Sequence, residues 1–270
     1  MSGHTYYSQY NKAEFDEPFY AGEPKQVLIL ASTPRVGSTL LLRGLMSIDA
    51  IAASTEFFNP VHRVDFEARW GTLSDKEYLE KLIQHRTKSN GLFAVKAHYN
   101  HFSLYEQYLK SFNLHFISIQ RKDIVLQAVS WFKGELTESW SSEKVSRKNI
   151  NESDYDFYAI SSKVKEINEL YQQWETYYSV NGHTPDRIFY EDIDKNYGDI
   201  LHNIANNFLS MSISRNSILE PSLKKQRDAL TKYYVSKFYN DHKQDKGDVK
   251  ITRPWRIQAW MQKIFNVPLR

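Results

Sequence analysis

Apolar and polar positions follow one another along the chain in a way that predicts strands followed by helices. The segment LILASTPRVGSTLLL, residues 28–42, is apolar except at residues 33–39, which predicts a strand, a short loop and the start of a helix. The segment LHFISIQ, residues 114–120, predicts a second strand, and IVLQAVSWF after it predicts a helix. Residues 186–193, DRIFYEDI, predict a further strand before another helical pattern. This succession predicts an α/β fold of three layers, in which helices flank a mostly parallel central sheet.

Longer apolar periodicities predict further elements. Between residues 160 and 178, apolar side chains recur every three or four positions, which predicts a long amphipathic helix that Gly182 ends. Residues 47–54, SIDAIAAS, lead toward a second short strand. A late helix is expected to pack inward through three apolar residues spaced four apart, which are Leu230, Tyr234 and Phe238.

Composition and charge narrow the class of protein. The 270 residues, 41% of them hydrophobic, are enough for one sizeable domain at residues 25–245, between an arm at 1–24 and an aromatic, basic tail at 246–270. No apolar run reaches the roughly 20 residues of a transmembrane helix, and the first residues are too polar for a signal peptide. The absence of cysteine fits the reducing cytoplasm. The net charge of +3 suits small anionic ligands and is too low for nucleic-acid binding.

The loop at residues 34–39, PRVGST, has the features of an anion site. N–H groups at a helix start can surround an anion together with the hydroxyls of Ser38 and Thr39, and Gly37 lets the main chain come close. A nucleoside-triphosphatase loop places lysine before the hydroxyl residue, whereas this chain has Gly37 there. The loop therefore suits a nucleotide without a triphosphate tail, with a plain strand–helix turn as the alternative.

Cations follow the second predicted strand at its carboxyl end. Arg121 and Lys122 come directly after LHFISIQ, and ligands of open parallel sheets bind beyond the carboxyl ends of the strands. We therefore expect a second anion site near the loop at residues 34–39, to which Ser130 could add a hydroxyl from the next helix. In the alternative interpretation, residues 121–123 form a solvated turn and Ser130 is a small packing residue.

Six segments of the chain resemble, in this order, the bacterial carbohydrate sulfotransferase family typified by mycobacterial trehalose 2-sulfotransferase. They lie between residues 30 and 240 and read PRVGSTLLLRGL, TEFFNP, FAVKAHYNH, ISIQRKDIVLQAVSWF, IFYEDI and LKKQRDALTKYYVSKF. The resemblance implies a P-loop-like sulfotransferase fold and transfer of the sulfuryl group of 3′-phosphoadenosine 5′-phosphosulfate (PAPS) to a hydroxyl of a sugar or glycolipid. This donor carries a 5′-phosphosulfate and a separate 3′-phosphate, which agrees with the missing lysine. Relatives associate near the acceptor site, so the resemblance also implies a homodimer.

The resemblance further implies which residues bind the donor. The 5′-phosphosulfate is expected at the loop, against Pro34, Arg35, Gly37, Ser38 and Thr39. The 3′-phosphate is expected at Arg121 and Ser130, with Lys122 as an alternate. A late basic segment is expected to close over the nucleotide through Lys225, Gln226 and Arg227, with a solvated helix start as the alternative.

Glu56 aligns with the family's glutamate general base. A positioned carboxylate can take the proton of a sugar hydroxyl as the new S–O bond forms in an in-line displacement. Phe57 and Phe58 beside it are expected to desolvate the carboxylate partly and to raise its pKa, while an ordinary turn carboxylate is the alternative. Arg35 and Lys96, which ends the segment LFAVK, are the candidate cations near the bridging oxygen.

Histidine and tryptophan residues supply candidates for the acceptor site. His98 and His101 form an H-x-x-H pair, but no third ligand lies at a convincing spacing, so we expect no metal and place both in the acceptor pocket or at a loop cap. The polar, helix-poor stretch at residues 133–156 predicts either a mobile lid or an acceptor-binding insertion. Trp140 within it, and Trp70, could stack on a sugar face, or else each pins a loop onto its own domain.

Two other classes of function are open on the sequence alone. A small-molecule or nucleoside kinase with a degenerate phosphate loop would bind ATP with magnesium, against which the missing lysine and the pair Arg121 and Ser130 argue. A non-catalytic PAPS- or phosphate-binding module would bind nucleotide without turnover. Within the transferase class, a protein tyrosine or a small phenol is the runner-up acceptor.

Overall fold

The chain forms two compact units in the computed structural model, and each unit is discontinuous in sequence. The first unit comprises Met1–Ser32, Gly37–Ile119 and Thr184–Pro221, and the second comprises Thr33–Val36, Gln120–His183 and Ser222–Arg270. The predicted division into an arm, one domain and a tail stays a prediction. The structure describes residues 8–71, 73–140, 146, 148–220, 227–244 and 251.

A four-stranded sheet forms the centre of the first unit, with the strand order β2-β1-β3-β4. Its strands are β1 (Gln26–Ser32), β2 (Leu92–His98), β3 (Leu114–Gln120) and β4 (Asp186–Phe189). β1 is the buried central strand and pairs in parallel with both β2 and β3. The register places Ser32 opposite His98, so the carboxyl ends of β1 and β2 meet at one edge of the sheet. The prediction of a parallel central sheet is therefore confirmed.

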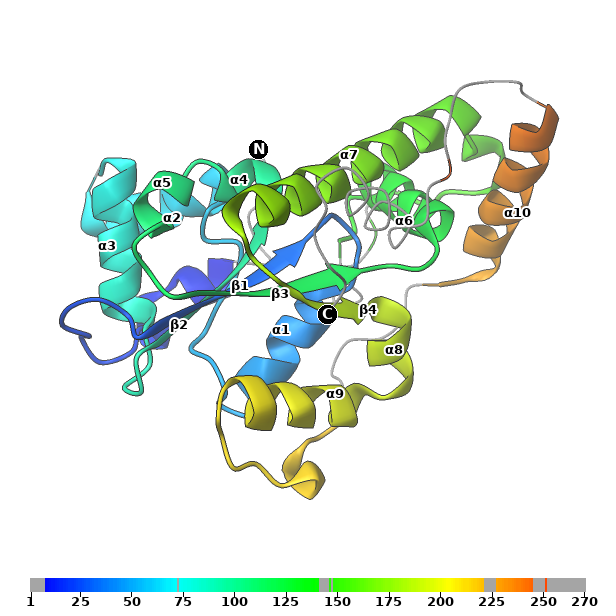
Figure 1. The fold of residues 1–270 in the computed structure, drawn as a ribbon. Coiled ribbons are helices and arrows are strands. Elements are labelled where there is room, and N and C mark those ends of the chain that lie inside the picture. The colour runs from blue at the N-terminus through cyan, green and yellow to red at the C-terminus, as the bar shows by residue number, and fades with distance from the viewer. Residues whose placement is uncertain are drawn as a thin grey trace. The chain divides into compact units, whose positions relative to one another are not determined.

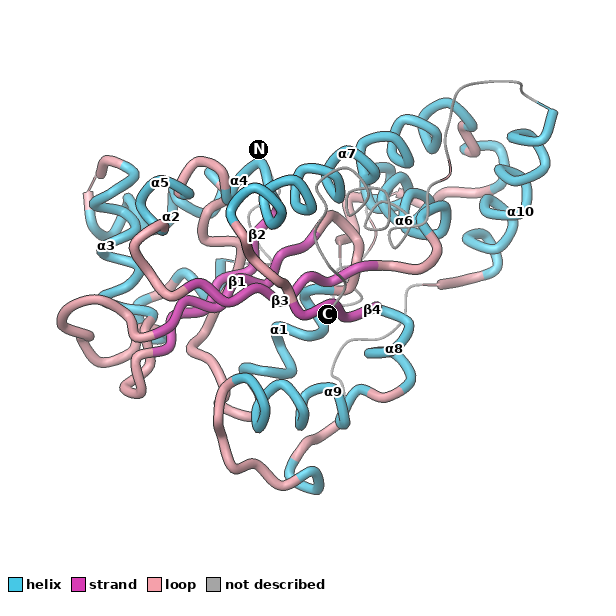
Figure 2. The backbone as a smooth tube through the Cα atoms, viewed as in Figure 1, coloured by secondary structure: helices cyan, strands magenta, loops and turns pink. Residues whose placement is uncertain are grey.

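Helices cover both faces of this sheet, which completes the predicted three layers (Figures 1 and 2). Figure 1 shows α1, α8 and α9 on one face, and α2, α4 and α5 on the other. The α-helices of the first unit are α1 (Ser38–Ser47), α2 (Pro60–Trp70), α3 (Asp75–Arg86), α4 (Tyr99–Phe102), α5 (Glu106–Leu109), α8 (Tyr190–Lys195) and α9 (Tyr197–Asn203). Short 3-10 turns lie at Ser8–Asn11, Ala13–Phe15 and Arg215–Ser217, and a π turn at Ile204–Phe208 follows α9.

The prediction of a short strand after residues 47–54 is wrong, because none of residues 48–56 is in a strand. Residues 48–56 are irregular, and they lie along β2 through isolated hydrogen bonds instead of a regular ladder. The Ser54 hydroxyl donates to the Ala94 carbonyl at 2.8 Å, and the Lys96 N–H donates to the Thr55 carbonyl at 3.3 Å. These two contacts hold the segment that leads to Glu56 against the sheet.

The described part of the N-terminal arm packs on its own unit. The fully buried guanidinium of Arg86 donates to the Phe15 carbonyl at 2.9 Å and pairs with Asp16 at 2.8 Å. Arg69 donates to the Asn11 carbonyl at 2.6 Å. The described part of the arm therefore lies over the surface formed by α2 and α3.

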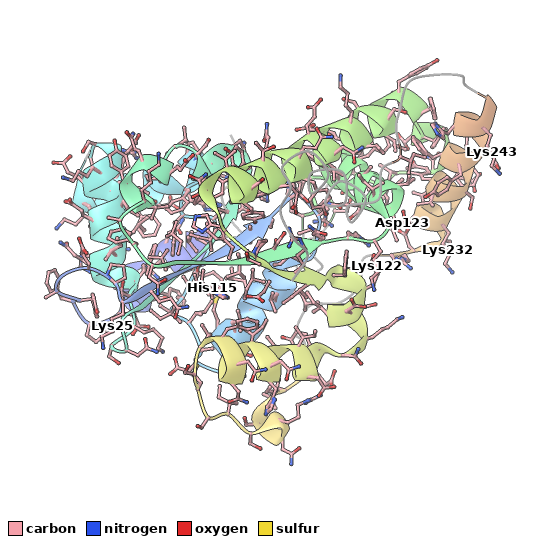
Figure 3. The ribbon with its side chains drawn as sticks, in the orientation of Figure 1. Lys25, His115, Lys122, Asp123, Lys232 and Lys243 are labelled. Carbon is pink, nitrogen blue, oxygen red and sulfur yellow. The ribbon has the colours of Figure 1, made fainter. Side chains whose placement is uncertain are left out.

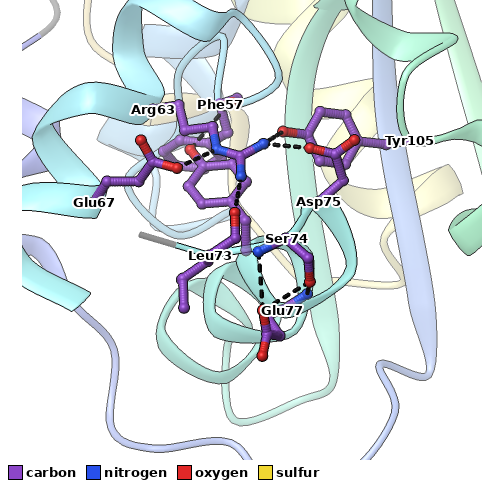
Figure 4. Close-up of polar contacts among 9 residues, drawn as sticks. Phe57, Arg63, Glu67, Leu73, Ser74, Asp75, Glu77 and Tyr105 are labelled. Atoms are coloured by element: carbon purple, nitrogen blue, oxygen red, sulfur yellow. Dashed lines mark hydrogen bonds and ion pairs between the residues drawn. The ribbon is translucent and has the colours of Figure 1, made fainter. Parts of the chain in front are cut away.

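A network around Arg63 fixes the segment that follows Glu56 (Figure 4). Arg63 donates to Glu67 at 2.8 Å and to the Tyr105 hydroxyl at 3.3 Å, and it also binds Asp75 and the Leu73 carbonyl. Nearby, the Tyr78 hydroxyl donates to the Phe57 carbonyl at 3.0 Å. Phe57 and Phe58 are themselves completely buried. The backbone beside Glu56 is thereby held by both polar and apolar contacts.

In the described residues of the second unit, three α-helices surround one apolar core. They are α6 (Ile124–Thr137), α7 (Phe157–Asn181) and α10 (Ala229–Gln244), with a 3-10 turn at Glu152–Asp154. As predicted, α7 ends at Gly182, which has a positive φ of 69°. The predicted inward packing of the late helix is also confirmed, because Tyr234 and Phe238 are fully buried in this core and Leu230 packs against it.

The polar stretch between α6 and α7 begins later than predicted. α6 continues to Thr137, so residues 133–137 are helical. Leu136 packs against the apolar core, and Lys133 binds Asp228 at 2.6 Å and the Thr231 hydroxyl at 2.8 Å. These tertiary contacts favour helix where the polar composition favours a loop. Of the predicted tail at residues 246–270, all but residue 251 lies outside the described residues.

Candidate functional site

The helix α1 begins at the predicted anion loop with an open N-terminus. Gly37 is the N-cap residue, has a φ of 89°, and gives α1 no side-chain cap. A Cβ at this position would lie 2.3 Å from a ring carbon of Tyr190, which starts α8. Glycine is therefore required both by the left-handed backbone and by the ring beside it. Gly37 has no side chain that could cap the first turn of α1, which is an arrangement that an anion can use.

In the second unit, Gln127 holds the residues that precede this helix. Its side-chain amide is fully buried and donates to the Thr33 hydroxyl at 2.8 Å and to the Pro34 carbonyl at 2.7 Å. The Tyr171 hydroxyl donates to the Gln127 carbonyl oxygen at 3.1 Å and accepts the Arg121 backbone N–H at 3.1 Å. Burial raises the pKa of Tyr171 to about 12, so the phenol stays protonated. The sequence analysis missed Gln127 and Tyr171, although the single amide in the apolar segment IVLQAVSWF was a signal.

Three predicted donor-site residues come together in the second unit. Arg35 donates through Nε to the Ser130 hydroxyl at 3.1 Å, and Arg121 donates to the Arg35 carbonyl at 3.2 Å. Arg35 adopts a left-handed backbone with a φ of 61°, and its guanidinium also donates to the Trp140 carbonyl. Arg121 is buried and Lys122 is exposed. The structure thus places the cation expected at the 5′-phosphosulfate next to the pair expected at the 3′-phosphate.

Figure 3 labels Lys122 and Asp123 in the connection between β3 and α6. The Asp123 carboxylate caps α6 by accepting the Leu126 N–H at 2.9 Å. This cap fixes where α6 begins and therefore how Gln127 and Ser130 are presented by the helix. The solvated-turn interpretation holds for Lys122 and does not hold for the buried Arg121.

In the first unit, Glu56 and Lys96 form a buried ion pair. The Lys96 Nζ lies 2.7 Å from Glu56 Oε1 and donates to the Thr39 hydroxyl at 3.2 Å. The Lys96 side chain is 2% exposed and that of Glu56 is 10% exposed. The Asn59 amide donates to the other Glu56 oxygen at 3.2 Å. One ammonium group therefore connects a hydroxyl in the first turn of α1 with the candidate base.

The pKa of Glu56 shifts in the direction opposite to the prediction. Burial does raise this pKa, but the charge of Lys96 and the hydrogen bonds of Lys96 and Asn59 outweigh burial and hold the pKa well below its ordinary value. Burial lowers the pKa of His98 to about 4, so at neutral pH the imidazole is uncharged and Lys96 is the effective cation. The sequence analysis accounted for the two phenylalanines and omitted this lysine.

His98 and His101 lie beside the same carboxylate. The His98 Nε2 is 3.9 Å from Glu56 Oε1, and the rings of His98 and His101 stack with their centroids 5.9 Å apart. One candidate ligand atom from each of Glu56, His98 and His101 lies within 4.8 Å of the others. Glu56, from a distant part of the sequence, thus lies beside the two histidines as a candidate third ligand, while the expectation of no metal stays a prediction. His98 also precedes α4 without capping it through its side chain.

The other predicted site residues are placed as follows. Trp70 stacks on His85 with centroids 5.4 Å apart and packs on Phe66, so its ring contributes to packing within its own unit. The Trp140 side chain is 38% exposed and its ring lies over Gly134. Arg227 is exposed ahead of α10, whereas Lys225 and Gln226 lie outside the described residues. The acceptor and donor roles predicted for these residues stay predictions.

None of the helices in the described part of the chain has the length and apolar character that a membrane-spanning helix requires.

Several solved structures are similar to this chain at low sequence identity. Among solved structures, the sulfotransferase domain from the Synechococcus PCC 7002 olefin synthase is 12% identical with a TM-score of 0.47, and the match covers 94% of this chain and 100% of that chain. Retinol dehydratase in complex with retinol and PAP is 12% identical with a TM-score of 0.43, covering 98% and 88% of the two chains. A comparison with curated proteins gives no match.

The sequence of residues 106–241, just over half of the chain, matches the family described as Stf0 sulphotransferase. The matched segment contains Arg121 and Ser130, whereas Gly37, Glu56 and Lys96 precede it. Since half of the chain matches, the protein belongs to the Stf0 sulphotransferase family and is a sulfotransferase.

Proposed function

We propose that this sulfotransferase takes the sulfuryl group from PAPS and transfers it to a hydroxyl of a carbohydrate or glycolipid, with Glu56 as general base. The observation that carries the proposal is the Lys96 ammonium, which contacts Thr39 in the first turn of α1 at 3.2 Å and Glu56 at 2.7 Å. A single cation thereby connects the helix start that suits an anion with the carboxylate that suits proton transfer.

The residues around the loop fit the donor. The uncapped N-terminus of α1 and the close approach allowed by Gly37 suit a 5′-phosphosulfate, with the hydroxyls of Ser38 and Thr39 as further donors. Arg35, Arg121 and Ser130 supply the cations and the hydroxyl for the remaining phosphate charge. When bound, PAPS would supply a sulfuryl group already activated by a phosphate leaving group. Solved retinol dehydratase complexes contain PAP, which is the desulfated form of this donor.

Lys96 regulates the basicity of Glu56 in this proposal. In the ion pair, Lys96 lowers the pKa of Glu56 and makes the carboxylate a weak base. As Lys96 turns toward negative charge at the start of α1, its hold on Glu56 weakens, and burial then raises the pKa of the carboxyl. Glu56 accepts the acceptor proton, while the Lys96 ammonium stabilises charge that develops on the transferring group.

The acceptor class rests on the sequence resemblance. His98 and His101 lie next to Glu56 and are the best-placed acceptor contacts, whereas Trp70 and Trp140 remain candidates for stacking on a sugar. Arg227, with Lys225 and Gln226, remains a candidate for closing over the donor. A cytoplasmic location and a homodimer belong to the same proposal, the first because the chain has no cysteine.

Incubation of the full chain with radiolabelled PAPS and a panel of acceptors tests this function. Transfer of label to trehalose or to a glycolipid sugar, with little transfer to a tyrosine peptide or a simple phenol, is the expected result. Transfer only to phenolic acceptors would contradict the carbohydrate assignment. Phosphate transfer from ATP with magnesium would instead support the kinase alternative.

Gly37→Ala is expected to weaken binding of the desulfated donor strongly and to lower the free energy of unfolding by about 1–3 kcal/mol. The new Cβ would meet the Tyr190 ring at 2.3 Å in a backbone conformation that alanine rarely adopts. Gly22→Ala is the matched control, because Gly22 also has a positive φ but no atom lies within 4 Å of its Cβ position. Calorimetry and urea unfolding check both variants. Wild-type affinity in Gly37→Ala would show that the loop needs no close approach.

Gln127→Leu is expected to weaken donor binding because the Thr33–Val36 segment loses two hydrogen bonds, each worth about 0.5–1.5 kcal/mol. Leucine keeps most of the side-chain volume, so the apolar contacts of α6 are retained. Gln172→Leu, at an exposed position of α7, serves as the control. Calorimetry should show a lower donor affinity in Gln127→Leu and an unchanged affinity in Gln172→Leu. Equal affinities in the two variants would show that Gln127 does not position the loop.

A further inference from the structure

We propose that Glu56, His98 and His101 form a binding site for a divalent transition-metal ion, with zinc as the best fit, and that the bound ion inhibits sulfuryl transfer. All three residues belong to the first unit and converge from three places, namely the irregular segment before α2, the end of β2 and helix α4. Two imidazoles and one carboxylate are a ligand set that zinc accepts, with a fourth position left for water.

The distances in this cluster are close to those of a metal site. The three candidate ligand atoms lie within 4.8 Å of one another, and Glu56 Oε1 is 3.9 Å from His98 Nε2. In a tetrahedral zinc site, with bonds of 2.0–2.1 Å, ligand atoms lie roughly 3.3 Å apart. Zinc binding would therefore draw the three ligand atoms closer together. Among the residues that the structure describes, no other group of three histidine or carboxylate side chains meets the same distance criterion.

A second observation points to a ligand at His101. The Nδ1 atom of His101 is buried and has no hydrogen-bond partner among the described residues. A buried ring nitrogen without a partner loses its hydration and gains nothing in exchange. If His101 bound a metal ion, one ring nitrogen would coordinate the ion, and the imidazole could reorient so that the other nitrogen finds a hydrogen-bond partner. The chain contains no cysteine that could compete for zinc.

Lys96 would compete with the metal ion for the Glu56 carboxylate. The Lys96 ammonium lies 2.7 Å from Glu56 Oε1, which is the carboxylate oxygen next to His98. A dication on this oxygen and an ammonium beside it repel each other, so zinc binding displaces Lys96 toward Thr39, which it already contacts. A carboxylate bound to zinc cannot accept a proton. The inhibitory effect therefore rests on the proposed role of Glu56, whereas metal binding itself does not.

Zinc titration of the metal-free full chain by calorimetry tests the site, and cobalt absorption spectra report the coordination independently. We expect one zinc per chain and a visible cobalt band. Loss of an outer contact alone costs about 10- to 100-fold in metal affinity, so removal of a ligand in His98→Ala or His101→Ala should lower affinity at least about tenfold. Lys96→Met should raise the affinity, because the competing ammonium is gone. His202→Ala, which removes a partly exposed imidazole of α9, should change nothing.

Absence of a one-to-one zinc site, or equal affinity in His101→Ala and His202→Ala, would overturn the proposal. His101 is partly exposed, so its alanine variant should fold, and its unfolding midpoint is compared with that of the wild type. In the activity assay, zinc should inhibit transfer reversibly, with recovery after chelation. Zinc binding without inhibition would overturn the inhibitory role alone. An enzyme inactive toward every acceptor would contradict the proposed function and leave the binding result to stand by itself.

Discussion

Glu56→Gln is expected to lower kcat by about 10²- to 10⁴-fold while the Kd of the desulfated donor stays nearly unchanged. Glutamine keeps the shape of the side chain and can still accept from Asn59, but it cannot take a proton from the acceptor hydroxyl. The effect should appear in kcat, because Glu56 acts on the acceptor proton in the transition state. Radiolabelled sulfuryl transfer gives kcat, and calorimetry gives the donor Kd.

Glu106→Gln is the matched control for this experiment. Glu106 lies on α5, and its side chain is 24% exposed and 3.8 Å from Lys110, so the same chemical change there removes only a surface ion pair. Its kcat should equal that of the wild type. Full activity in Glu56→Gln would show that another group takes the proton. Loss of donor binding together with kcat would instead indicate that Glu56 holds the structure of the site through Lys96.

Lys96→Met is expected to lower the free energy of unfolding by about 3–5 kcal/mol, because it leaves the buried Glu56 carboxylate without its main cation. Lys88→Met is the control, since Lys88 pairs with Asp49, whose side chain is 87% exposed, and such a surface pair contributes about 0–1 kcal/mol. The double variant with Glu56→Gln should recover part of the loss, because it removes the stranded charge. Urea unfolding of the wild type, the two single variants Lys96→Met and Glu56→Gln, and the double variant completes this double-mutant cycle. Equal costs for Lys96→Met and Lys88→Met would contradict a buried, energetically coupled pair.

The stability difference should also depend on pH. The pKa of Glu56 is lowered in the folded protein from an ordinary value of 4.5, so the pair contributes fully above that pH. As the pH falls below 4.5, protons bind the unfolded chain first and the contribution declines. Wild type and Lys96→Met should therefore approach each other in stability in acid, as measured by unfolding at pH values from neutral downward.

Local pattern was sufficient for much of the fold. The apolar segments at β1 and β3 predict these two strands, because a buried parallel strand requires a continuous apolar run. The ends of these segments in turn locate the loop that follows β1 and the cations that follow β3. The spacing of apolar residues predicts helix α7, and Gly182, which readily adopts a left-handed backbone, predicts where this helix ends. The short strand predicted to follow residues 47–54 is absent, because this part of the chain is tied to β2 by single contacts, which no local pattern records.

The candidate site was predictable in its residue types and not in their contacts. Glu56, Lys96, His98 and His101 were all singled out, but their mutual distances depend on how an irregular segment lies along β2. From the sequence alone, the neighbouring phenylalanines imply a raised pKa for Glu56. In the structure, Lys96 lowers this pKa instead. Glu56 was not recognised as a neighbour of His98 and His101 for the same reason, since it lies 42 residues before His98 in the sequence.

Calorimetric titration of the full chain with 3′-phosphoadenosine 5′-phosphate, beside ATP with magnesium, tests the PAPS-dependent sulfotransferase assignment most directly. We predict preferential binding of the bisphosphate, about 10- to 100-fold weaker in Arg121→Ala because a charge-assisted contact is lost. Lys122→Ala, which removes the exposed neighbouring cation, should have a much smaller effect. No binding of the bisphosphate, a preference for ATP, or unchanged affinity in Arg121→Ala would contradict the proposed donor site.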